Sequence, residues 1–110
     1  YTRDRVKGEK IPLEFLVRKQ TKETAETFGL MDRGQIKEGY MADINIIDHD
    51  NLCVYKPEMV HDLPTGSRRI IQKAGGYIAT IKSGVVTFKN DEATGELPGT
   101  LIRGEQTAAA

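Results

Sequence analysis

The chain has 110 residues, and its 16 basic and 16 acidic side chains give no net charge, which argues against binding to nucleic acid or anionic membranes. At this length, a hydrophobic content of 38% allows one modest core and predicts one small domain. The single cysteine cannot form an internal disulfide, and no apolar run approaches the roughly 20 residues that span a bilayer, so we expect a cytoplasmic location.

The N-terminal segment, residues 1–10, is charged and lacks periodicity. It has neither an initiator methionine nor the apolar core of a signal peptide, so we expect a chain cut from a longer protein. From Pro12 onwards the pattern predicts a short amphipathic helix, because proline suits a first helical position. Its apolar face has helical spacing and consists of Leu13, Leu16 and Val17.

A second short helix is predicted directly after the first. Thr21 is a suitable N-cap, and Gly29 is available as a left-handed C-cap. After Gly29 the hydrophobic period falls from about 3.6 to 2, which is typical of strands. A short strand is expected at 34–39 between two glycines, and a clear one at 42–48, where apolar and polar residues alternate.

The remaining elements are predicted from turn residues. A single helical turn is expected at 57–60 and a tight turn at 63–66. Two strands at 76–82 and 85–89 are separated by Ser83-Gly84, which predicts a β-hairpin. A last short strand is expected within 97–104.

These elements predict an α+β fold that is mainly β, with two short helices followed by a small sandwich-like sheet, antiparallel or mixed. The expected organisation is a helical segment at 1–29, a β-rich portion at 30–104 and a disordered tail at 105–110.

The residues that could carry chemistry do not form a recognisable site. His49 and His61 lack the spacing of a zinc pair, so surface or capping roles are favoured, although Asp48, Asp50 and Asp62 lie beside them in sequence. Cys53 lies between Leu52 and Val54 in a run expected to be half-buried, and it is interpreted as a buried structural thiol rather than a nucleophile.

Other motifs are absent or weak. The sequence has no Gly-x-Ser-x-Gly elbow and no phosphate-binding Gly-x-x-x-x-Gly-Lys loop. Lys82 at the hairpin turn is expected to be a solvated turn lysine. Ser67-Arg68-Arg69 could grip a carboxylate, but a solvated dipeptide is favoured. We therefore predict no catalytic, cofactor-binding or metal-binding residue in this chain.

Two ordered blocks of residues carry a family resemblance. The first block resembles the C-terminal signature of the amidohydrolase superfamily and consists of Thr21, Ala25, Gly29-Leu30, residues 32–36, Gly39 and residues 42–48. The second block is similar to the N-acyl-D-amino-acid deacylase (D-aminoacylase) branch and consists of residues 62–66, Gly76-Tyr77, Gly84-Val85 and residues 94–104.

The resemblance implies a metal-dependent barrel enzyme with a small β-sandwich built from both chain ends. In such enzymes a metal-bound hydroxide attacks an amide carbonyl and an aspartate handles the proton. The His-x-His pair is missing here, and Asp4 does not match the catalytic aspartate. The resemblance therefore implies a non-catalytic C-terminal portion, inactive alone, with zinc bound only in the full-length enzyme.

Two alternatives remain at this point. The chain could be a stand-alone β-rich binding or oligomerisation module derived from this family, or a small hydrolase that uses His61 and Asp62. Its expected partner is the missing barrel region or a homodimer mate, because a sheet without its neighbouring strands has an open edge. Otherwise the apolar faces of the two helices would have to cover the sheet.

Overall fold

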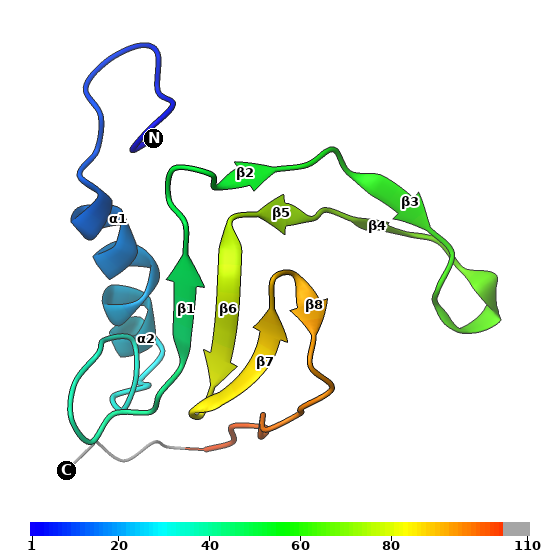
Figure 1. Ribbon diagram of the computed structural model, residues 1–110. Coiled ribbons are helices and arrows are strands. Elements are labelled where there is room, and N and C mark those ends of the chain that lie inside the picture. Colours follow the sequence, from blue (N-terminus) through cyan, green and yellow to red (C-terminus); the bar gives the residue numbers. More distant parts are fainter. Residues whose placement is uncertain (105–110) are drawn as a thin grey trace.

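The structure is a computed structural model and describes residues 1–104. Two short helices stand beside a four-stranded sheet, and a long two-stranded ribbon extends away from that sheet (Figure 1). All strand pairs are antiparallel. The predicted α+β, mainly β fold is confirmed, whereas the tail expected at 105–110 lies outside the described residues.

The two helices are almost continuous. Helix α1 spans Leu13–Gln20 and helix α2 spans Lys22–Thr27, with Thr21 between them at φ −115° and ψ −82°. Thr21 is the N-cap residue of α2, as predicted, but its side chain does not cap that helix. Instead, its hydroxyl donates to the carbonyl of Val17, 2.8 Å away in the preceding turn.

Helix α2 ends just before Gly29, the residue predicted to be its left-handed C-cap. Gly29 has a φ of +70°, and its N–H donates to the carbonyl of Glu26 while Leu30 N–H donates to that of Ala25. This pair of bonds is the Schellman arrangement. The chain then folds back so that a Cβ at Gly34 would lie 2.9 Å from the Cβ of Ala25, which is only 7% exposed.

The four-stranded sheet has the order β1-β6-β7-β8. Its strands are β1 (Ile44–Ile47), β6 (Tyr77–Lys82), β7 (Val85–Lys89) and β8 (Glu92–Ala93). The hairpin predicted between β6 and β7 is confirmed. Ser83 and Gly84 both have positive φ, at 52° and 79°, which matches the twist of a two-residue hairpin turn.

The ribbon between β1 and β6 is called the arm and comprises residues 53–75. Its base is the pair β2 (Cys53–Val54) and β5 (Ala74–Gly75), and its outer part is the pair β3 (Glu58–Val60) and β4 (Arg69–Ile71). A 3₁₀ turn at Pro64–Gly66 forms the tip, where Gly66 N–H donates to the carbonyl of Leu63. The predicted tight turn at 63–66 is thus confirmed.

Three predicted elements are wrong. Residues 34–39 form bends and turns instead of a strand, because Gly34 and Gly39 both have positive φ and bend the backbone. In place of the helical turn expected at 57–60, Glu58–Val60 form strand β3, since pairing with β4 overrides the local signal. Residues 97–104 contain no strand; Pro98 lacks the N–H that a ladder requires.

The described chain buries very little of itself. Ala25 and Gly75 are the only buried residues in the range 1–104. The accessible surface is 9123 Å², whereas a folded monomer of 12.2 kDa exposes about 6100 Å². The radius of gyration is 16.8 Å, against about 13 Å for a compact chain of this length. Residues 1–104 therefore form an open assembly of elements with almost no buried core.

Candidate interaction surface

Large apolar side chains remain exposed on every part of the fold. Phe28 on the helical side is 76% exposed and Phe88 on β7 is 47% exposed. The helices therefore do not cover the apolar residues of the sheet. The alternative in which the two helices pack over the sheet is wrong. Further exposed apolar residues are Leu13, Phe15, Val17, Ile46, Val54, Met59, Ile70 and Ile78. Because monomeric proteins rarely leave so much apolar surface open, these residues form a candidate interaction surface.

A hollow lies in the corner where the arm leaves the sheet. Its volume is 420 Å³. Aromatic side chains form much of its wall, and one basic and one acidic residue lie among its polar groups. The lining residues are Tyr55, Lys73, Ala74, Tyr77, Ala79, Thr80, Phe88 and Asp91. A hydrogen bond with Cys53 raises the pKa of the Tyr55 hydroxyl at the base of the arm.

The tip of the arm is held in one shape by polar contacts. Arg69 donates two hydrogen bonds to Asp62, at 2.7 and 2.6 Å, and the bond from Arg69 lowers the pKa of that carboxyl. Thr65 has a φ of +70°, and its hydroxyl lies 3.1 Å from that of Ser67. Arg68, beside this pair, has no hydrogen bond or ion pair within residues 1–104. The two arginines therefore do not act together as a carboxylate grip.

The N-terminal segment is anchored through Arg3, a contact that sequence reasoning missed. The guanidinium of Arg3 donates to the carbonyls of Asp50 and Leu52, each at 2.6 Å, and to that of His49. It also pairs with Asp4 at 2.7 and 2.8 Å, and this bond lowers the pKa of Asp4. Asp4 is thus engaged in a structural pair. The only signal in the sequence was an arginine beside an aspartate.

The other residues considered for chemistry do not come together. His49 contacts the hydroxyl of Thr2 at 3.1 Å, and His61 is exposed on the arm. Cys53 is exposed, so the prediction of a buried structural thiol is wrong; within residues 1–104 its strand pairs only with β5. Lys82 does not stand free at the hairpin turn, because its amine lies 2.9 Å from the Asp43 carboxylate.

The described residues do not fit a catalytic metal. No group of three His, Cys, Asp or Glu side chains within 1–104 is placed to hold an ion. The zinc that the family resemblance implies therefore has no ligand set in this part of the chain. The absence of catalytic and metal-binding residues stays a prediction. Neither of the helices in residues 1–104 has the length and apolar character needed to cross a membrane.

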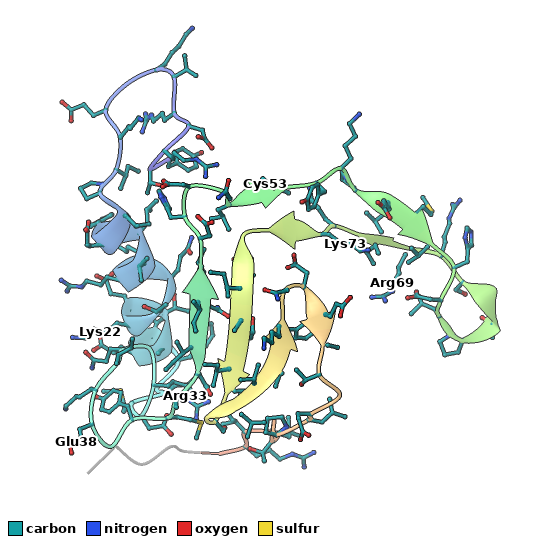
Figure 2. All side chains as sticks on the ribbon, viewed as in Figure 1. Lys22, Arg33, Glu38, Cys53, Arg69 and Lys73 are labelled. Carbon is teal, nitrogen blue, oxygen red and sulfur yellow. The ribbon has the colours of Figure 1, made fainter. Side chains whose placement is uncertain are left out.

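Charged residues are distributed over separate parts of the surface. Figure 2 shows Arg69 and Lys73 on the arm, and Arg33 beside the lower end of β1. Arg33 pairs with Asp32 at 2.8 Å and lies 3.9 Å from Asp43. Arg33 and Arg69 form ion pairs that join neighbouring segments, whereas Lys73 has none within residues 1–104. The two ion pairs can hold these segments together.

Comparison with known proteins decides the family. Residues 2–88 match the model of a family described as "Amidohydrolase family". This chain belongs to the amidohydrolase family. The D-aminoacylase of Alcaligenes xylosoxydans xylosoxydans is 33% identical over 91 residues, which are 83% of this chain and 17% of that protein. No solved structure matches.

The family match confirms the resemblance that the two blocks of residues carry. It extends from the N-terminal segment through α1, α2, β1 and the arm to β7. The arm is therefore part of the region that matches the amidohydrolase model. This amidohydrolase chain spans about a sixth of the length of its D-aminoacylase relative.

Proposed function

We propose that this chain serves as the C-terminal, non-catalytic portion of a metal-dependent amidohydrolase that hydrolyses the amide bond of N-acyl amino acids. Its role is to pack against the catalytic barrel and stabilise it. The reaction, the substrate class and the metal are proposed for the longer protein to which this chain would belong. Residues 1–104 themselves supply no step of the chemistry.

The observation that carries the proposal is the exposed surface. The chain leaves 9123 Å² accessible, which exceeds the value for a compact monomer of this mass by roughly 3000 Å². Exposed apolar side chains on the helices and on the sheet need a second surface to exclude water from them. A barrel encoded in the same longer chain provides such a surface, and the likeness to one stretch of a D-aminoacylase supports this arrangement.

A complementation experiment tests the proposal. The stretch of the Alcaligenes D-aminoacylase that matches this chain is replaced by residues 1–110, and hydrolysis of an N-acyl-D-amino acid is measured with added zinc. We expect the chimera to be soluble and active, and the relative that lacks this stretch to be neither. Residues 1–110 alone should show no turnover; turnover by this chain alone would overturn the proposal.

A matched pair of substitutions shows whether the exposed apolar surface is responsible. Phe28 is 76% exposed, so Phe28→Ser removes little packing within the chain itself. In the chimera this change should lower the yield of soluble, active protein severalfold. Thr27→Ser, at the neighbouring position, keeps a hydroxyl and should leave the yield unchanged. Equal yields for the two variants would argue against burial of this face.

A further inference from the structure

We draw no further inference here: the strongest candidate, the corner hollow between the base of the arm and strands β6 and β7, shares Phe88 with the interaction surface already described, and nothing in the structure of residues 1–104 shows what covers it.

Discussion

The carboxylate of Asp43 lies 2.9 Å from Nζ of Lys82, although 39 residues separate the two in sequence. The same carboxylate oxygen accepts the backbone N–H of Ser83 at 2.9 Å. Gly84 N–H adds a bond to the carbonyl of Ala42 at 3.0 Å. These contacts fasten the start of β1 to the β6–β7 turn, so Asp43 sets where β1 lies against β6.

Replacing Asp43 should therefore destabilise the sheet. Asp43→Asn removes the charge that faces Lys82 and weakens the bond to Ser83, and we expect a loss of about 1–2 kcal/mol in the free energy of unfolding. Urea denaturation followed by circular dichroism measures it. The control is Asp50→Asn, because the side chain of Asp50 is 94% exposed. A loss no larger than that of the control would contradict the role of Asp43.

The same contact predicts a dependence on pH. Burial acts to raise the pKa of Asp43, but the bonds from Ser83 and Lys82 prevail and hold it below its ordinary value of 3.8. The hydrogen bond from Arg33 likewise lowers the pKa of Asp32. The folded state thus releases these protons more readily than the unfolded state. The stability that the Asp43 and Asp32 carboxylates contribute is fully present above their ordinary pKa. It is lost as the pH falls through their lowered pKa values in the folded state.

Urea midpoints measured between pH 7 and pH 2 check this sign. The unmodified chain should lose stability below about pH 4, where unfolded aspartates take up protons. Asp43→Asn should start from a lower midpoint and lose less on acidification, since one of the responsible carboxylates is gone. Parallel curves for the two proteins would show that Asp43 does not contribute to the acid response.

Gly76 should not tolerate a side chain. It has a φ of +92°, and an added Cβ would lie 2.7 Å from the Cα of Leu52 and 3.0 Å from the carbonyl oxygen of Asp48. We expect Gly76→Ala to destabilise the chain by more than about 1 kcal/mol, because a strained backbone and a steric clash add together. Gly99→Ala is the matched control, since beyond its chain neighbours no atom of residues 1–104 lies within 4 Å of its Cβ position. Thermal denaturation should separate the two.

The tip of the arm should loosen when its ion pair is broken. Asp62→Asn removes the charged acceptor of both bonds from Arg69. The pair is half exposed, so the global stability should change little, whereas local opening of the tip should become more frequent. Hydrogen exchange of the amides at 62–69 should become severalfold faster. Glu58→Gln, at a carboxylate that has no ion pair within residues 1–104, should leave these rates unchanged, and unaltered rates in Asp62→Asn would refute the prediction.

Local chemistry in the sequence determined several elements of this protein. Gly29 ends helix α2 because glycine reaches positive φ without strain, and Ser83-Gly84 closes the hairpin because a two-residue turn needs that geometry. The ordered blocks of residues were enough to indicate the amidohydrolase family. Each of these features depends on neighbours within a few residues, so the sequence pattern contains the necessary information.

Only the tertiary structure decided the features that join distant segments. Glu58–Val60 form strand β3 because β4 lies beside them, and Cys53 is exposed because no element within residues 1–104 covers the base of the arm. Arg3 binds carbonyls that lie 46 to 49 residues further along. Such contacts depend on which segments meet in space, and the periodicity of a single segment does not specify its partner. The same reason explains why the sequence allowed one modest core, whereas residues 1–104 leave most of their large apolar side chains exposed.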